Sequence, residues 1–101
     1  MVIVIFEFEM DCVGQDRYFE LATALRDEVE KIEGFISVER FENIRKPGLF
    51  VSISTWENME AVSVWKEHVE HFSTQQEAKA TGIFKHYRIR VAEVIRDYGS
   101  D

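Results

Sequence analysis

The sequence predicts an α+β fold whose six elements follow the order strand, helix, strand, strand, helix, strand. Apolar and polar residues alternate with the period of two that strands require in four segments, namely residues 1–10, 35–43, 49–56 and 83–95. Apolar residues recur at helical spacing in two further segments, residues 16–33 and 58–80. Gly, Pro, Asn and Asp residues lie between these segments and mark the turns.

The first strand is apolar on both faces at its start. Val2, Val4, Phe6 and Phe8 lie on one face, and Ile3 and Ile5 lie on the other. A half-exposed strand would alternate more cleanly, so both faces need a cover. A turn over residues 11–15 follows, and Asp16 is the predicted N-cap of the first helix. This helix extends to about Glu33, where Gly34 is predicted to end it in the left-handed conformation.

The second and third strands form a predicted hairpin around the turn at residues 45–48, which contains Pro and Gly. The expected faces of the second strand are Ile36, Val38 and Arg40 on one side and Phe35, Ser37, Glu39 and Phe41 on the other. The third strand sets Leu49, Val51 and Ile53 against Phe50, Ser52, Ser54 and Trp56.

Asn58 is the predicted N-cap of the second helix. Its apolar stripe weakens at residues 71–74, which predicts a break and a short second helical piece over residues 73–80 that ends at Gly82. The last strand, over residues 83–95, carries Tyr87, Ile89, Val91 and Ile95 on one face, and a polar tail follows at residues 96–101.

This order of elements is the split βαβ arrangement of a ferredoxin-like domain. Right-handed crossovers place both helices on one face of a four-stranded antiparallel sheet, and the other face stays bare. Because apolar residues occur on both faces, a second copy of the chain is the economical cover for the bare face. We therefore expect one domain over residues 1–101 that forms a homodimer, a dimeric α/β barrel.

Composition argues against several partners and locations. The formal net charge is −7 and no basic patch is present, so neither nucleic acid nor an anionic membrane is an expected partner. The chain has one cysteine, so no internal disulfide forms and a reducing cytoplasm suits the fold. The first residues lack the pattern of a signal peptide. No apolar stretch reaches the ~20 residues of a membrane span.

The order and spacing of several short segments resemble the antibiotic biosynthesis monooxygenase family of dimeric α/β barrels. The resemblance covers about residues 2–98 and rests on Ile32-Glu33-Gly34-Phe35, Ser37-Val38-Glu39-Arg40-Phe41, Ser54-Thr55-Trp56, Glu60-Ala61-Val62 with Trp65, His71, and the run from Phe84 to Asp97 with Tyr87, Arg90 and Val91. It implies an enzyme that oxidises a small electron-rich phenol or quinol with O₂ and needs no flavin, haem or metal. Such an enzyme binds an apolar aromatic between helices and sheet, takes a proton and stabilises an oxyanion.

The candidate catalytic residues are His71, Tyr87 and Arg40. His71 is the first choice for a base, because imidazole titrates near neutral pH and this residue lies where the helical stripe weakens. Tyr87 and Arg40 are candidates to donate to a substrate oxygen. The candidate substrate-binding residues are Trp65, Trp56, His68, Phe84 and Gln75.

Each of these residues also has a structural interpretation. The histidine is then hydrogen-bonded at a helix break, the tryptophans are core residues, and the tyrosine hydroxyl satisfies a backbone carbonyl. Arg40 and Arg90 then form salt bridges between subunits. His86 is expected to be exposed. His68 and His71 have a spacing that allows a shared metal, but no third ligand is suggested, so no metal site is predicted.

Two other functions stay open at this point. The first is a non-catalytic, ligand-binding or stress-associated barrel dimer. The second is haem binding or breakdown, which in related barrels relies on an Asn in the first strand with a Trp and a His on the second helix. Trp65 and a His are present here, whereas residues 2–10 contain no Asn.

Overall fold

The six predicted elements are present in the predicted order. They are β1 (Val2–Glu9), α1 (Cys12–Val29), β2 (Phe35–Glu42), β3 (Leu49–Trp56), α2 (Met59–Gln75) and β4 (His86–Glu93). The structure is a computed structural model that describes residues 1–75 and 84–100, with the backbone alone for residues 12–13 and 71–75.

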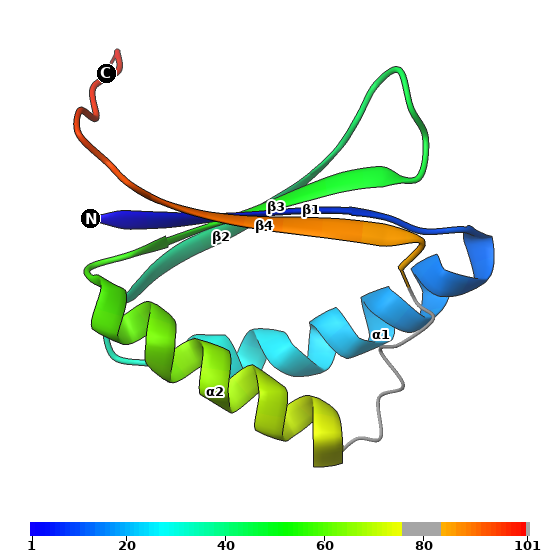
Figure 1. The fold of residues 1–101 in the computed structure, drawn as a ribbon, viewed down its shortest axis with the longest axis horizontal. Helices are drawn as coiled ribbons and strands as arrows, with labels where there is room; N and C mark the ends of the chain where they lie inside the picture. Colours follow the sequence, from blue (N-terminus) through cyan, green and yellow to red (C-terminus); the bar gives the residue numbers. More distant parts are fainter. Residues whose placement is uncertain (76–83, 101) are drawn as a thin grey trace.

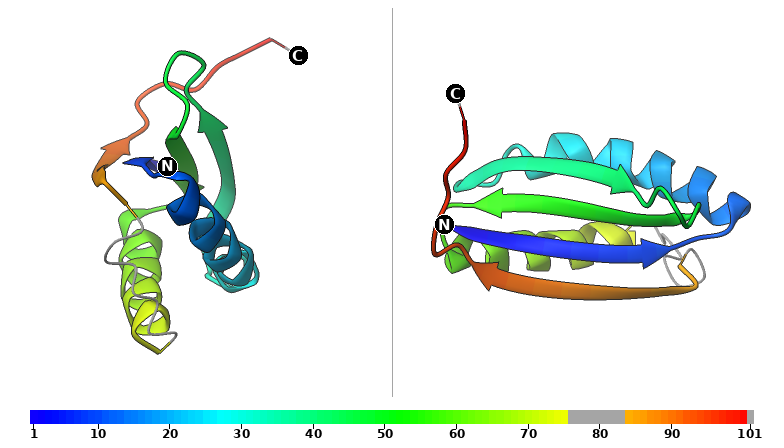
Figure 2. Two further views of the ribbon diagram at one scale, coloured as in Figure 1. Left: turned by 90° about the vertical axis from the view of Figure 1, so that its right-hand side faces the viewer. Right: turned by 90° about the horizontal axis from the view of Figure 1, so that it is seen from above.

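The strands form one antiparallel sheet in the order β2-β3-β1-β4. Both helices lie against one face of this sheet, as Figure 1 shows, and the opposite face is bare (Figure 2). We call these the helix-covered face and the bare face. The arrangement confirms the predicted ferredoxin-like α+β fold.

Helix α1 begins and ends earlier than predicted. Its N-cap is Asp11 and not Asp16, because the Asp11 Oδ1 atom accepts a hydrogen bond of 2.7 Å from the Gly14 N–H. The helix ends at Val29, after which the backbone bonds tighten to a spacing of three residues. Gly34 does have a positive φ of 95°, but it lies beyond the helix. A Cβ atom there would meet the Ala61 Cβ atom at 2.7 Å, so this glycine permits the close approach of α2.

Helix α2 begins as predicted and continues past the position of the predicted break. The Ala61 N–H donates to the Asn58 Oδ1 atom at 2.9 Å, which confirms Asn58 as the N-cap. The helix runs without a break through residues 71–74 to Gln75. The rest of the predicted second helical piece, and Gly82, lie outside the described residues.

Two strands differ from the prediction in detail. A β-bulge between Phe35 and Ser37 shifts the register of β2, so Phe35 lies on the helix-covered face with Val38 and Arg40. Ile36 is left half-exposed by this shift. Strand β4 spans His86–Glu93, shorter than predicted, because it pairs with β1 over the eight residues of that strand.

The core consists of two buried clusters between the sheet and the helices. One contains Val2, Val29, Trp56, Ala61 and Val62. The other contains Phe8, Met10 and Phe50, with Phe6, Tyr18, Phe19 and Phe84 packed against it. No polar or charged residue is buried among the described residues, so apolar packing provides the stability.

Candidate functional site

The register of the sheet aligns side chains in four rows across the helix-covered face. The two outer rows are Phe35, Trp56, Val2 and Glu93 at one end and Glu42, Phe50, Phe8 and Tyr87 at the other. The two inner rows are Val38, Ser54, Val4 and Val91, then Arg40, Ser52, Phe6 and Ile89. Because the inner residues of β3 are serines, the large aromatic side chains of that strand are confined to the two ends.

We name the two ends by their residues. The tryptophan end consists of Trp56, Trp65, His68 and Glu28. The phenylalanine end consists of Phe8, Phe50, Phe84, Tyr18 and Tyr87.

Two indole rings form the wall of the tryptophan end. Trp56 is fully buried, and its Nε1–H donates to the Ser54 Oγ atom at 2.9 Å. The Trp65 ring lies 6.2 Å from the Trp56 ring, with 31° between their planes. The buried indole nitrogen of Trp56 is satisfied within the sheet, and the partly buried Trp65 ring presents the apolar aromatic surface of this pair.

His68 joins the two helices at this end. Its imidazole stacks on the Trp65 ring at a centroid distance of 5.7 Å and an angle of 28°. Its Nε2 atom lies 2.9 Å from the Glu28 Oε1 atom of α1. The side chains of His68 and Glu28 are 37% and 25% exposed, so the pair is sheltered but open to solvent. A histidine oriented by a carboxylate is the arrangement of a general base with its orienting group.

The charge on Glu28 determines which imidazole nitrogen is free. The hydrogen bond from His68, followed by that from Lys31, lowers the pKa of Glu28 below its ordinary value of 4.5. Glu28 is therefore ionised at neutral pH and can only accept hydrogen bonds. In the neutral imidazole of His68 the proton must then be on Nε2, which leaves Nδ1 as the acceptor.

Phe8 is the centre of the phenylalanine end. This fully buried ring lies 4.7 Å from Tyr18, 5.2 Å from Phe84 and 5.8 Å from Phe50. Tyr87 lies 6.0 Å from Phe84 and is 62% exposed. The end therefore has a closed aromatic interior and an open rim at the β4 edge.

Arg40 covers the other side of this end. Its guanidinium carbon lies 5.0 Å from the Phe19 ring centre and 5.4 Å from the Tyr18 ring centre. These are cation–π distances. Burial raises the pKa of the Tyr18 hydroxyl. The hydrogen bond that the Arg40 guanidinium donates to this hydroxyl opposes the rise. Tyr18 therefore stays protonated and remains a hydrogen-bond donor.

The structure divides the predicted site residues between the two ends. Trp56, Trp65 and His68 come together, and Phe84 lies beside Tyr87 at the opposite end. Arg40 joins the phenylalanine end through Tyr18. The side chains of His71 and Gln75 lie outside the described residues.

Two charged residues considered in the sequence lie on the bare face. Arg90 binds Glu7 together with Arg88, and His86 lies 2.8 Å from Glu9 and is mostly exposed, as predicted. Arg90 therefore points away from the helix-covered face.

Sequence reasoning missed Glu28 and Tyr18 as site residues. Glu28 follows the acidic pattern of an exposed helix face, and its partner is forty positions away, so no local signal identified it. Tyr18 begins the apolar stripe of α1, and only the packing of α1 on the sheet brings it beside Arg40.

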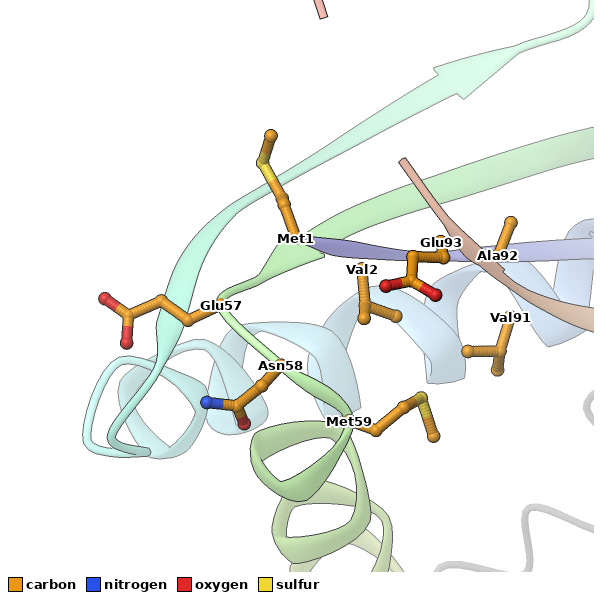
Figure 3. A pocket seen from close by; sticks show the side chains of 8 residues that line it. All are labelled: Met1, Val2, Glu57, Asn58, Met59, Val91, Ala92 and Glu93. Carbon is orange, nitrogen blue, oxygen red and sulfur yellow. The ribbon is translucent and has the colours of Figure 1, made fainter. Parts of the chain in front are cut away.

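A pocket of about 420 Å³ opens beside the tryptophan end. Figure 3 shows it between the start of β1, the end of β4 and the first residues of α2. Val2 lines it and also packs in the cluster of Trp56, so the pocket borders that cluster. A second hollow of about 330 Å³ lies largely on the bare face, where Ile5, Phe41 and Val51 contribute to its lining.

In residues 1–75 and 84–100, no helix is long and apolar enough to cross a membrane. Within the same ranges, no group of three or more His, Cys, Asp or Glu side chains is placed to hold a metal ion.

Comparisons with a family model and with individual proteins point to the same family. The model of the family described as antibiotic biosynthesis monooxygenase matches residues 1–78. A protein of Pyricularia oryzae named jasmonate monooxygenase ABM is 31% identical over 94 residues, which are 93% of this chain and 43% of that protein. The chain spans about half the length of the curated relatives it matches.

Solved structures share the fold over almost the whole chain. A mutant of MhuD with two manganese protoporphyrin IX bound per active site has a TM-score of 0.77 at 17% identity, and covers 99% of this chain and 100% of its own. The monooxygenase ActVA-Orf6 of Streptomyces coelicolor, in complex with nanaomycin D, has a TM-score of 0.75 at 17% identity, and covers 99% and 92%.

Proposed function

Because the chain belongs to the antibiotic biosynthesis monooxygenase family, we propose that it is a monooxygenase that oxidises a small electron-rich aromatic with O₂ and without a cofactor. The named relative from Pyricularia oryzae, a jasmonate monooxygenase, supports a monooxygenase activity.

The observation that carries the proposal is the hydrogen bond between His68 and Glu28 beside Trp65. The carboxylate fixes the imidazole with Nδ1 free to accept a proton. Trp65 provides a flat aromatic surface next to that imidazole, against which an aromatic substrate can stack. A base beside an aromatic wall suits deprotonation of a phenol.

The proposed reaction balances without an added reductant. His68 takes the phenolic proton, and the resulting phenolate is rich enough in electrons to reduce O₂. One oxygen atom forms a bond to a ring carbon and becomes a quinone oxygen. The other leaves as water with the two hydrogens that the phenol loses from its hydroxyl and that ring carbon. The substrate supplies all four electrons.

The remaining site residues have proposed roles in binding. Trp65 forms the wall beside the reacting ring, and the fully buried Trp56 supports Trp65 from behind. Tyr87 and Phe84 form a second aromatic surface at the opposite end, where the exposed Tyr87 hydroxyl can donate to a substrate oxygen. His68 thus takes the role of base, for which His71 was the first choice from the sequence.

Oxygen consumption with a panel of quinols and anthrone-like phenols tests the activity. We expect His68→Gln to lower kcat by about 10²–10⁴-fold, the usual contribution of a general base, while KM changes little. His86→Gln is the matched control, because His86 also pairs with a glutamate but lies on the bare face.

Three outcomes would contradict this proposal. Loss of activity in His71→Gln but not in His68→Gln would reassign the base. No oxygen uptake with any compound would favour the non-catalytic binding protein. A Soret band on addition of haemin that disappears in His68→Gln would favour haem binding instead.

We also propose that the protein is a homodimer whose bare faces meet. Ile3, Ile5, Val51 and Ile53 give this face an apolar centre, and Phe41 beside it is 50% exposed. No helix of the described chain covers these residues (Figure 2). Burial in a second copy would remove this surface from water. Sedimentation should give a dimer at micromolar concentration that Ile53→Asp dissociates, and a stable wild-type monomer would disprove it.

A further inference from the structure

Arg40 is the only cationic side chain on the helix-covered face of the sheet, within the strands that the structure describes. Its nearest acidic neighbour along that face of β2 is Glu42. The Glu42 Oε2 atom instead accepts a hydrogen bond of 3.1 Å from the Gly48 N–H. In the described part of the chain, no carboxylate forms an ion pair with Arg40.

The arginines of the bare face are different. Arg88 and Arg90 both bind the same carboxylate, Glu7. On the surface of α1, Arg17 lies 3.5 Å from Glu20. Among the described residues, the partners of the Arg40 guanidinium are two aromatic rings and the Tyr18 hydroxyl, so it keeps donors for an anion from outside.

Three donor-bearing residues are neighbours at this position. The Arg40 guanidinium lies over the Tyr18 ring, whose hydroxyl stays protonated. Ser52 is the direct partner of Arg40 on the neighbouring strand and faces the same side of the sheet. A guanidinium with two hydroxyls suits a carboxylate, which accepts several hydrogen bonds at once.

We propose that Arg40, Tyr18 and Ser52 form a carboxylate subsite at the phenylalanine end, so that the substrate class of this enzyme is aromatic acids. The inference rests on the proposed function. The carboxylate binds at one end, and the ring to be oxidised lies toward His68 at the other.

The overall charge of the protein makes such a subsite necessary for an acidic substrate. The formal net charge of −7 repels anions over the whole surface. A local cation must overcome this repulsion. The Tyr18 and Phe19 rings beside Arg40 offer apolar surface to the part of the molecule next to the carboxylate.

Calorimetric titration with 2-naphthoate and 2-naphthamide tests the subsite without catalysis. The two ligands share their ring and differ in charge. We expect wild-type protein to bind the naphthoate more tightly by about tenfold or more, as charge-assisted hydrogen bonds allow. Arg40→Gln should abolish this preference, Arg40→Lys should keep part of it, and Tyr18→Phe should weaken it severalfold.

Arg17→Gln is the matched control, because it removes the same charge from α1 next to Tyr18 in sequence. It should leave the preference unchanged. Equal binding of both ligands by the wild type, or equal loss in Arg17→Gln and Arg40→Gln, would overturn the subsite. Circular dichroism of each variant checks that the fold is kept. A preserved preference without any oxygen uptake would retain the subsite and reject the monooxygenase.

Discussion

The tryptophan end and the phenylalanine end both rest on large aromatic residues, but their polar groups are arranged differently. At the tryptophan end, imidazole and carboxylate are hydrogen-bonded to each other across two helices. At the phenylalanine end, a guanidinium lies over two rings without a carboxylate partner in the described chain. The first arrangement orients an imidazole and leaves its Nδ1 atom as a free acceptor, whereas the second leaves guanidinium donors free for a ligand.

The two ends are expected to affect different properties of the protein, namely stability at the phenylalanine end and activity at the tryptophan end. Phe8 contacts three aromatic rings from other elements and is fully buried, so it anchors α1 and β3 to β1. His68 is partly exposed and contacts one ring and one carboxylate. We expect changes at Phe8 to act on folding and changes at His68 to act on activity.

The largest effect on stability is expected for Phe8→Ala. Removing this ring leaves a cavity at the centre of the phenylalanine end, and such truncations lower the free energy of unfolding by about 3–5 kcal/mol. Urea unfolding followed by circular dichroism measures the loss. Tyr98→Ala, at a residue that is 87% exposed, is the control and should change stability by no more than about 0.5 kcal/mol. Similar losses in both variants would show that Phe8 is not an anchor.

Sequence periodicity was sufficient for the elements and for most faces of the sheet. Alternation along β1, β3 and β4 predicted which side chains share a face of the sheet, because a strand has a strict period of two. The bulge at Ile36 reversed the expected side of Phe35, and it depends on pairing with β3, which no local pattern records. For the cap of α1, Asp11 and Asp16 are equally good residue types, so composition alone did not choose between them.

The candidate site was predictable only in part, for a related reason. Trp56, Trp65, Phe84 and Tyr87 were identified as candidate residues from their type and their place in the sequence. Their division between two ends depends on strand pairing, which sets Trp56 and Tyr87 beside opposite ends of β1, and on the packing of α2, which brings Trp65 to Trp56. The link between His68 and Glu28 depends on how α1 and α2 pack, since it joins residues forty positions apart.

The smallest effect is expected for Glu28, the carboxylate that orients His68 at the tryptophan end. In the folded protein the pKa of Glu28 is lowered, so the unfolded chain holds the proton more strongly. The ionised carboxylate therefore stabilises the fold at a pH above its ordinary value of 4.5. This stabilisation is lost as the pH falls through the lowered pKa of the folded state.

Glu28→Gln should consequently be less stable than the wild type at pH 6, and the difference should shrink toward pH 3. Urea midpoints of both proteins at the two pH values measure this change. Glu67→Gln, at an exposed residue of α2, controls for the loss of one negative charge and should show a smaller change with pH. A wild-type advantage over Glu28→Gln that is the same at both pH values would mean that the hydrogen bond from His68 does not stabilise the carboxylate. The tryptophan end would then lack the oriented imidazole on which its proposed role as the base depends.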